Sequence, residues 1–443
     1  MELILYLEFL VMKMNISNKS WLLSLLVLMS LISGSCTAAS GSKVMASDKP
    51  RITSPDIPPQ VVESVATGNN SFALDLYHSI SDEDNNLIFS PYSLSLALAM
   101  TYSGARGETE SQMAKVMHFD LPQHDLHPAF NSLDQALMDQ PAVSGQDGEP
   151  FELHIANAIW AEQTYPFLQS FLDLLSENYG AGVNLADFIT DPERERKIIN
   201  AWVEDQTREK IKDLIPAGIL DELTRMVLVN AIYFKADWMS PFEKSATHDS
   251  AFHLLDETEL LVPTMSQSFF SVPYSIGEDY QAIELAYAGN KAAMDILVPE
   301  PGAFREFEAG LNPTKLSEIL GGFEDSSVML NLPKFSYSSE INLSNSLKVL
   351  GMRDAFDTER ADFTGMSESR DLYISDVLHK AFVALDEEGT EAAAASAVIM
   401  GVTSAQPSGI ILTIDRPFIY LIRDLPTGQI LFMGRVTNPL GSE

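Results

Sequence analysis

The 443-residue sequence predicts an α+β fold in which helices come early in the chain and strands come late. In the first half, several segments repeat apolar residues at the spacing of an amphipathic helix. Strand-like segments dominate from Met226 onward. No Gly/Ser-rich or Pro-rich linker interrupts the chain after residue 62, which favours one large domain over residues 62–443. The helical segments are residues 72–77, 93–102, 108–116, 166–180 and 192–212.

The helical segment at residues 93–102 has a start signal. Pro91 suits the first turn of a helix, and the hydroxyl of Ser90 can cap it. Alanine and serine along this segment allow a neighbouring element to approach closely. Breaks follow at Gly104–Gly107 and, after the last helical segment, at Pro216–Gly218.

Two strand predictions stand out. After a polar loop, residues 152–160 alternate between polar and apolar side chains as a half-buried strand does. Near the end of the chain, the turn-forming stretch 424–429 separates the apolar runs 418–422 and 430–433. This pattern predicts a terminal hairpin.

The composition limits the classes of partner. The chain has 28 Lys+Arg against 62 Asp+Glu, a net charge of -34, and its hydrophobic content of 46% is enough for a large core. So much negative charge repels phosphate backbones and anionic membranes, which argues against nucleic acid or a polyanionic cofactor as partner. We interpret the acidic surface as a device for solubility or salt adaptation.

Residues 1–36 have the anatomy of an export signal. An apolar run from Trp21 to Ile32 follows two lysines and ends in small residues, and it is too short for a confident transmembrane span. Two acidic residues precede the run, which does not suit a signal's basic front end. Met12 and Met14 are therefore alternative starts of translation.

Cys36 is the only cysteine, so no disulfide can form within one chain. Its position after the apolar run resembles the lipid-attachment cysteine of prokaryotic lipoproteins, although Ser33 is an unusual residue three positions before it. Lipid anchoring at Cys36 and simple cleavage near Ala38 and Ala39 are the two alternatives. Residues 37–61, with four prolines, predict a flexible tether. We expect a secreted or cell-surface protein.

A run of acidic and then tiny side chains stands near the carboxyl end. Four consecutive alanines favour a surface helix, whereas the strand-like segments 373–385 and 410–414 on either side favour a loop between strands. We interpret the run as a loop. It contains Glu387, Glu388, Gly389, Thr390, Glu391, Ala392, Ala393, Ala394 and Ala395.

This run resembles the hinge of the serpin family, metastable proteins that inhibit proteases by inserting a cleaved loop into their own central sheet. The resemblance covers roughly residues 62 to 443, and so many further segments in the family's order argue against coincidence. These segments are Asn86–Ser93, Leu228–Trp238, Leu332–Phe335, Leu350–Met352, Ala361–Phe363, Val377–Ala381 and Leu431–Pro439.

The resemblance implies three β-sheets, about nine surrounding helices and an exposed reactive-centre loop. It also implies a monomeric suicide-substrate inhibitor of serine proteases, and of cysteine proteases as a further class, with no cofactor, metal or catalytic residue of its own. In the family, the protease forms an acyl-enzyme with the loop and is carried across the sheet before it deacylates. The intact inhibitor is kinetically trapped.

Strand alternation predicts how the hinge would insert. Thr390, Ala392 and Ala394 would face the core, while Glu391 would face solvent. A large or charged core-facing residue would place excess volume or unpaired polarity in a closed core. Gly389 would let the backbone swing.

The family's usual spacing from Gly389 places the reactive bond between Thr403 and Ser404. This loop is a few residues longer than in many relatives, so bonds after Met400, Gly401 or Val402 remain alternatives. None of these residues is Lys or Arg, which a trypsin-like target requires. Small side chains favour elastase-like or subtilisin-like targets, and Met400 leaves a chymotrypsin-like target open.

Five residues match positions at which the family controls loop insertion. Ser90, Ser93, Asn230 and His379 match the shutter, a hydrogen-bonded cluster under the strands that must part. Trp238 resembles the tryptophan of the breach, where the loop enters the sheet. The sequence pattern alone is also compatible with an ordinary core histidine and a generic core aromatic.

Other function classes fit the sequence less well. A non-inhibitory serpin, acting as chaperone, carrier or surface-binding protein, usually has charged or bulky hinge residues, and this hinge is intact. An enzyme is not indicated either, because the sequence contains no G-x-S-x-G, H-E-x-x-H, P-loop or G-x-G-x-x-G motif. His124 and His127 form only a weak metal pattern, which a solvated acidic loop explains better. An adhesin would leave the alanine run without a purpose.

Overall fold

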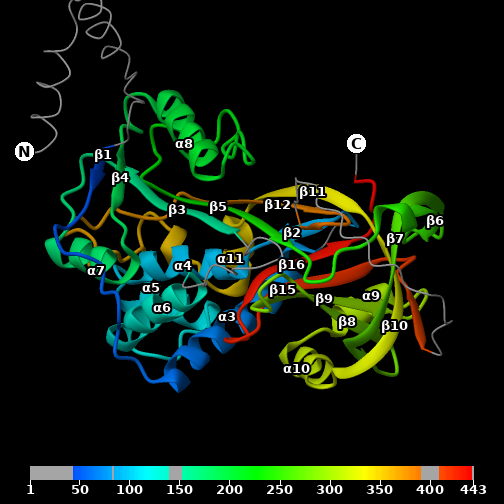
Figure 1. Ribbon diagram of the computed structural model, residues 1–443. Helices are drawn as coiled ribbons and strands as arrows, with labels where there is room; N and C mark the ends of the chain where they lie inside the picture. The colour runs from blue at the N-terminus through cyan, green and yellow to red at the C-terminus, as the bar shows by residue number, and fades with distance from the viewer. Residues whose placement is uncertain (1–42, 82–83, 139–151, 391–408, 442–443) are drawn as a thin grey trace, which may run out of the picture. The chain divides into compact units, whose positions relative to one another are not determined.

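The computed structural model describes residues 43–81, 84–138, 152–390 and 409–441. Helices dominate the first half of this part of the chain and strands the second, which confirms the α+β class (Figure 1). The helices are α3 (Pro59–Ile80), α4 (Pro91–Tyr102), α5 (Gly107–Val116), α6 (Gln123–Met138), α7 (Gln169–Tyr179), α8 (Pro192–Gln206), α9 (Phe304–Gly310), α10 (Pro313–Gly321) and α11 (Ser344–Leu350), with 3-10 turns η1 (Lys244–Ala246) and η2 (Asp354–Phe356).

A seven-stranded sheet, here called the central sheet, carries the sequence motifs of the predicted site. Its long strands β3, β5 and β12 lie in its middle, where β3 and β5 run antiparallel and β5 and β12 run parallel. In spatial order its strands are β1 (Lys43–Met45), β4 (Val183–Ala186), β3 (Glu152–Glu162), β5 (Met226–Asp237), β13 (Gly389–Thr390), β12 (Asp376–Leu385) and β11 (Phe335–Asn342).

The second sheet has nine described strands. Its strand β7 pairs with β8 only at residues 274–276 and continues along β10, which pairs with β14 farther on. These long strands therefore join two of the three expected sheets into one hydrogen-bonded array. The strands are β14 (Ile410–Thr413), β10 (Glu324–Pro333), β7 (Glu259–Ile276), β8 (Tyr280–Ala286), β9 (Ala292–Pro299), β15 (Phe418–Asp424), β16 (Ile430–Val436) and β2 (Leu87–Phe89), with β6 (His248–His253) paired to β7.

The two faces of the central sheet bury separate sets of side chains. Ile159 and Leu228 belong to the large core that includes α4, whereas Trp160 and Val229 pack with Ile199 of α8. Figure 1 shows α4 and α8 on opposite sides of the sheet. Because both faces are covered here, β5 is buried and apolar along most of its length rather than alternating.

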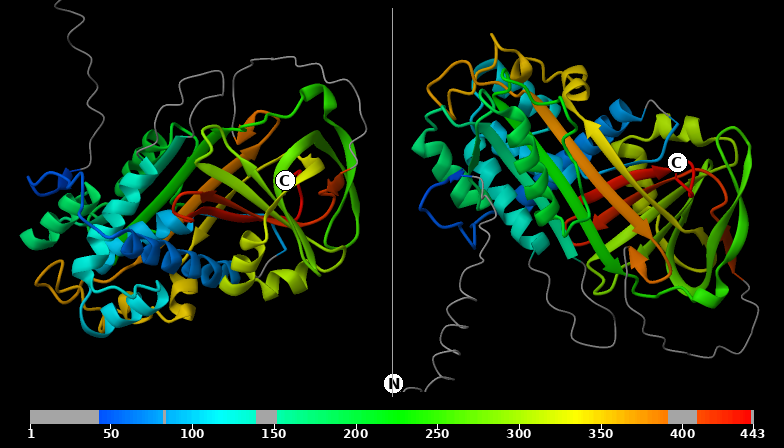
Figure 2. Two further views of the ribbon diagram at one scale, coloured as in Figure 1. Left: turned by 60° about the horizontal axis from the view of Figure 1, so that its bottom comes forward. Right: turned by 90° about the horizontal axis from the view of Figure 1, so that it is seen from above.

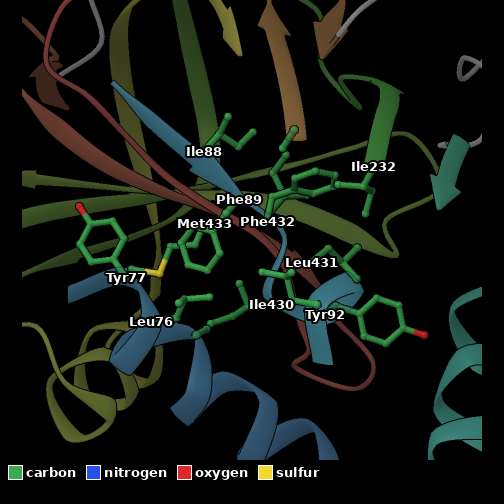
Figure 3. Packing of buried hydrophobic residues seen from close by; sticks show 14 of the residues in the cluster. Leu76, Tyr77, Ile88, Phe89, Tyr92, Ile232, Ile430, Leu431, Phe432 and Met433 are labelled. Atoms are coloured by element: carbon green, nitrogen blue, oxygen red, sulfur yellow. The ribbon is translucent and has the colours of Figure 1, made fainter. Parts of the chain in front are cut away.

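The large core joins the two sheets. In Figure 3, Leu76 and Tyr77 of α3 lie close to Met433 and Ile430 of β16, and Phe432 lies close to Ile232 of β5. Burying one such apolar side chain stabilises the fold by about 1.5–3 kcal/mol. The hairpin of β15 and β16, predicted from the sequence, thus supplies the middle of this core.

Local signals set the helix ends. The Ser90 hydroxyl accepts a hydrogen bond from the Ser93 amide and caps α4, as expected. Residues 192–212 were expected to be helical throughout, but α8 ends at Gln206. Arg208 and Glu209 have positive φ angles of 50° and 61°, which a right-handed helix cannot accommodate.

Residues 43–58 do not form the flexible tether that the sequence led us to expect for residues 37–61. Strand β1 pairs antiparallel with β4 from Lys43 to Met45. Arg51 forms an ion pair with Asp134 of α6 at 2.6 Å, and Lys49 contacts Asp173 of α7 at 3.1 Å. Composition suggested a flexible tether because it does not reveal that these charged residues have partners on α6 and α7. The compact unit therefore begins at Lys43, before the expected boundary at residue 62.

Within the ranges that the structure describes, no helix combines the length and the apolar character needed to cross a bilayer.

Candidate functional site

Strands β5 and β12 separate at one end of the central sheet. They pair in parallel from Val227 and Asp376 to Ile232 and Ala381 (Figure 2, right, green and orange). Farther along, β13 lies between them, paired antiparallel with β5 through Gly389 and Thr390 and with β12 through Thr390. The segment that leads into the predicted loop thus already occupies the first position between the two strands.

Gly389 is required by close packing. A Cβ atom at this position would lie 2.0 Å from the carbonyl oxygen of Ala236 and 2.7 Å from the Cα of Asp237. Both are backbone atoms, which cannot move aside cheaply. Gly389 has no positive φ angle in this structure, so the observed reason for glycine is the approach of β5 rather than backbone freedom.

Two glutamates fix the turn before β13. The carboxylate of Glu387 is buried, accepts a hydrogen bond from Thr247 at 2.7 Å and pairs at 2.6 Å with Lys334, which lies between β10 and β11. Burial alone would raise the pKa of Glu387, but the hydrogen bonds from Lys334 and Thr247 outweigh burial and lower it. Glu388 pairs with Lys244 at 2.5 Å, on a more exposed side. The first two acidic residues of the hinge therefore make specific contacts.

Trp238, the residue that resembles the breach tryptophan, lies beside the turn that leads into β13. Its indole Nε1 donates a hydrogen bond to the carbonyl oxygen of Asp386 at 3.1 Å. Its ring stacks on Tyr287, with centroids 4.7 Å apart and planes inclined by 5°. The Tyr287 hydroxyl lies 2.7 Å from Oγ1 of Thr390, so one aromatic stack contacts both sides of the hinge.

The four predicted shutter residues come together beneath β5 and β12. His379 of β12 and Asn230 of β5 are cross-strand partners, and His379 Nδ1 hydrogen-bonds Asn230 Oδ1. The backbone amide of Ser90 donates to His379 Nε2 at 3.1 Å, and the side-chain Nδ2 of Asn230 donates to the hydroxyl of Ser93 at 2.7 Å. All four residues are fully buried.

This network defines the state of His379. Because Nε2 accepts from the Ser90 amide, the proton must be on Nδ1, where it is donated to Asn230. Burial lowers the pKa of His379 to about 3, so the ring is neutral near neutral pH. Opening the sheet between β5 and β12 must break the bond between His379 and Asn230.

Asn157 is a site residue that the sequence analysis missed. Its side chain accepts hydrogen bonds from Asn230 at 2.5 Å and Ser93 at 2.9 Å, and donates to the Ser93 carbonyl at 2.9 Å. Asn157, Asn230 and His379 are neighbours in one row across β3, β5 and β12. The sequence signal that could have pointed to Asn157 is a side-chain amide beside the apolar residues Ala158 to Trp160 of the predicted strand.

Several predicted residues lie outside the described part of the chain. They are Cys36, the hinge residues Glu391, Ala392, Ala393, Ala394 and Ala395, and the candidates for the reactive bond Met400, Gly401, Val402, Thr403 and Ser404.

The weak metal pattern finds no support among the described residues, where no group of three or more potential ligands occurs. His127 is buried in α6, with Nδ1 2.7 Å from the hydroxyl of Tyr179, and burial lowers its pKa to about 3. His124 is exposed and lies 3.4 Å from Asp125. His127 is thus a core residue, and the two histidines have separate environments.

Comparison with known proteins decides the family. The family model for serpin (serine protease inhibitor) matches residues 67–439. The chain belongs to the serpin family. A leukocyte elastase inhibitor of Sus scrofa is 40% identical over 388 residues, which is 85% of this chain and all of that protein.

Solved serpin structures share the fold. The native state of the thermophilic serpin tengpin matches with a TM-score of 0.76 at 28% identity, covering 90% of this chain and 98% of tengpin. Human thyroxine-binding globulin complexed with thyroxine matches with a TM-score of 0.76 at 31% identity, covering 86% of this chain and all of that one. Since one of these structures is a complex with thyroxine, the serpin fold alone does not specify the activity.

Proposed function

We propose that this serpin is a suicide-substrate inhibitor of serine proteases, in which cleavage of the reactive-centre loop is followed by insertion of the loop into the central sheet. Elastase-like, subtilisin-like and chymotrypsin-like enzymes are the proposed targets. The inhibitor supplies a scissile carbonyl and stored conformational energy. The protease supplies all the catalytic groups.

The position of β13 between β5 and β12 carries this proposal. Insertion continues a pairing that has already begun at Gly389 and Thr390. The hinge beyond Thr390 consists mainly of alanine, which fits between packed strands without excess volume. Loop insertion requires both the parted strands and a hinge of small residues, so their combination favours inhibition over a purely carrier role.

The energetics favour insertion strongly. About 15 inserted residues would span roughly 50 Å at about 3.3 Å per residue, enough to displace a bound protease. Each new ladder hydrogen bond contributes about 0.5–1.5 kcal/mol, so the inserted strand adds on the order of 10 kcal/mol. The hydrogen bond between His379 and Asn230 closes the path along which the strand must enter. The intact state is therefore held by a kinetic barrier.

The target class follows from the residues at the reactive bond. We place that bond between Thr403 and Ser404, with Met400, Gly401 and Val402 as the nearby alternatives. Small or apolar side chains suit shallow apolar specificity pockets, whereas a trypsin-like pocket needs a cation. Similarity to a leukocyte elastase inhibitor supports the same class.

We also propose that residues 1–36 direct export and that the mature protein acts outside the cell, either free or anchored through a lipid on Cys36. The apolar run before Cys36 supports this proposal. Expression with radiolabelled palmitate distinguishes the two forms, because only the anchored form incorporates label, and Cys36→Ser should abolish that label.

The decisive experiment mixes the purified chain with elastase, subtilisin or chymotrypsin. A covalent complex that survives boiling in detergent is expected with at least one of them, and the cleaved inhibitor should melt about 10 °C higher than the intact one. Cleavage without a complex and without a gain in melting temperature would reject inhibition and favour a carrier or chaperone.

A pair of hinge variants sharpens the test. Thr390→Arg places a charge at a buried, core-facing position, so this variant should be cleaved without forming a complex. Glu391→Arg is the matched control, because strand alternation turns residue 391 to solvent. Equal complex formation by the two variants would show that the hinge does not insert with the proposed alternation.

A further inference from the structure

A small pocket lies beside the breach, between β7, β8 and the chain that follows β5. Its volume is about 160 Å³. An engineered apolar cavity of about 150 Å³ is large enough for a benzene ring, so this pocket can take a ligand with one ring-sized body. The lining residues that carry the argument are Trp238, Phe242, Phe269 and Glu284.

Three aromatic rings give the pocket its apolar wall. The rings of Trp238 and Phe242 pack edge to face with centroids 6.4 Å apart, and those of Phe242 and Phe269 with centroids 6.2 Å apart. Each ring is held by its neighbour, so the wall is preformed. Aromatic faces attract cations as well as apolar groups.

Glu284 gives the pocket its charge. It is the cross-strand partner of Asp295, which is fully buried. Arg423 of β15 is the cation at this cluster, with Nη2 2.7 Å from Glu284 and Nε 2.9 Å from Asp295. The other neighbouring strand, β7, contributes Phe269, Ser271, Val272 and Pro273 to the pocket and no charged group there. Two carboxylates thus share one guanidinium, and of the two acidic residues only Glu284 lines the pocket.

We propose that this pocket binds a small organic cation, an amine carried on an aromatic body, with the ammonium group at Glu284 and the ring against Trp238, Phe242 and Phe269. Charge complementarity selects this ligand class, because an ammonium group would balance the second carboxylate of the cluster. A neutral ring would gain only the apolar contacts, and an anion would be repelled.

The pH dependence of ligand binding supplies a second test of the proposal. Burial, and then the charge of Asp295, raise the pKa of Glu284 to about 7. A bound cation favours the ionised carboxylate, so it should bind about tenfold more weakly at pH 6 than at pH 8. Binding that depends only on the aromatic wall would show no such change.

The test uses 2-phenylethylamine as the probe and the full chain labelled with ¹⁵N in the tryptophan indoles. The Trp238 indole N–H resonance, assigned with Trp238→Phe, should shift in a saturable way with a dissociation constant in the millimolar range or tighter. Trp160 and Trp202 pack with each other in a separate core and serve as internal controls. The neutral analogue 2-phenylethanol should bind at least tenfold more weakly. Equal binding of alcohol and amine, or no shift at Trp238, would overturn the proposal.

Two variants locate the charge. Glu284→Gln keeps the ion pair between Arg423 and Asp295 and should lose both the preference for the amine and the pH dependence. Glu278→Gln removes an exposed carboxylate outside the pocket and should bind as the parent does. If Glu284→Gln fails to fold, Phe269→Ala tests the same pocket through its wall and should weaken both ligands. The readout is binding alone, so its outcome does not depend on protease inhibition.

Discussion

The hydroxyl of Tyr287 lies 2.7 Å from Oγ1 of Thr390, and both side chains are buried. Tyr287 follows β8 of the second sheet, whereas Thr390 is the last described residue before the reactive-centre loop. The first core-facing residue of the hinge is therefore held by the second sheet. This contact sets the face that Thr390 presents, on which the alternation of the following residues depends.

A double-mutant cycle should measure this contact. Tyr287→Phe leaves the Thr390 hydroxyl without this buried partner and should lower the free energy of unfolding by about 1–3 kcal/mol. Thr390→Val should also destabilise the protein, but the double variant should be less destabilised than the sum of the two single variants. Urea unfolding of the four proteins gives the coupling energy. Strict additivity would mean that the hydroxyl groups contribute no shared stabilisation.

Gly389→Ala should prevent β13 from forming. The new Cβ would meet the Ala236 carbonyl oxygen at 2.0 Å, so Gly389 and Thr390 must leave their position between β5 and β12. We expect at least a tenfold slower rate of complex formation with the target protease, measured by stopped-flow inhibition. Gly310→Ala is the matched control, because no atom lies within 4 Å of its added Cβ. Unchanged inhibition by Gly389→Ala would show that the hinge can enter by another path.

Glu387 should give the hinge a pH-dependent contribution. Its pKa is lowered below the ordinary value of 4.5 in the folded protein, so it stabilises the fold above that value and loses this effect as pH falls through its folded pKa. The difference in melting temperature between the parent and Glu387→Gln should be present at pH 7 and shrink below pH 4. Lys334→Met, which removes the partner cation, should reproduce the loss at pH 7. A difference that grows on acidification would contradict this assignment.

The shutter hydrogen bonds should control the lifetime of the intact state. His379→Ala removes the bond to Asn230 across β5 and β12, so the sheet should open more often and the chain should become latent or polymerise several-fold faster at an unchanged fold. Size-exclusion chromatography and loss of inhibitory activity at 37 °C follow the change. An unaltered lifetime would discard the shutter role and leave His379 as an ordinary core residue.

Acid should destabilise the protein through the same histidine. Its pKa is about 3 in the folded state against an ordinary 6.5, so the unfolded chain binds a proton first as pH falls. The stability is complete above pH 6.5 and declines toward pH 3, by up to about 5 kcal/mol at 1.36 kcal/mol per unit. His379→Gln should flatten this decline in unfolding measurements between pH 7 and pH 4. His127→Gln should have a similar effect, because burial lowers that pKa equally. Parallel curves for all three proteins would refute the linkage.

Strand and helix patterns predicted the parts of the fold that depend on local sequence. The capped start of α4 and the terminal hairpin were predictable because Ser90, Pro91 and the turn after Phe418–Ile422 act over a few residues. The tie between β1 and β4 and the ion pair of Arg51 with Asp134 were not, since they join distant residues with no shared pattern.

The site shows the same division. Resemblance to the family pointed to His379 and Asn230 but not to Asn157, whose hydrogen bond to Asn230 arises only because β3 lies beside β5. Gly389 was expected to serve as a flexible point, and only the structure reveals the backbone of β5 against it. Pairing across strands, rather than residue type, determines such contacts.

The short strand β1 also bears on self-association. A sheet that ends in an unpaired strand offers its free amide and carbonyl groups to another molecule, which is a common route to aggregation. Strand β1 pairs with β4 from Val183 to Leu185, so only three residues protect that edge of the central sheet. Loss of residues 43–45 would expose the edge of β4 to intermolecular pairing, so these three residues should affect the solubility of the protein.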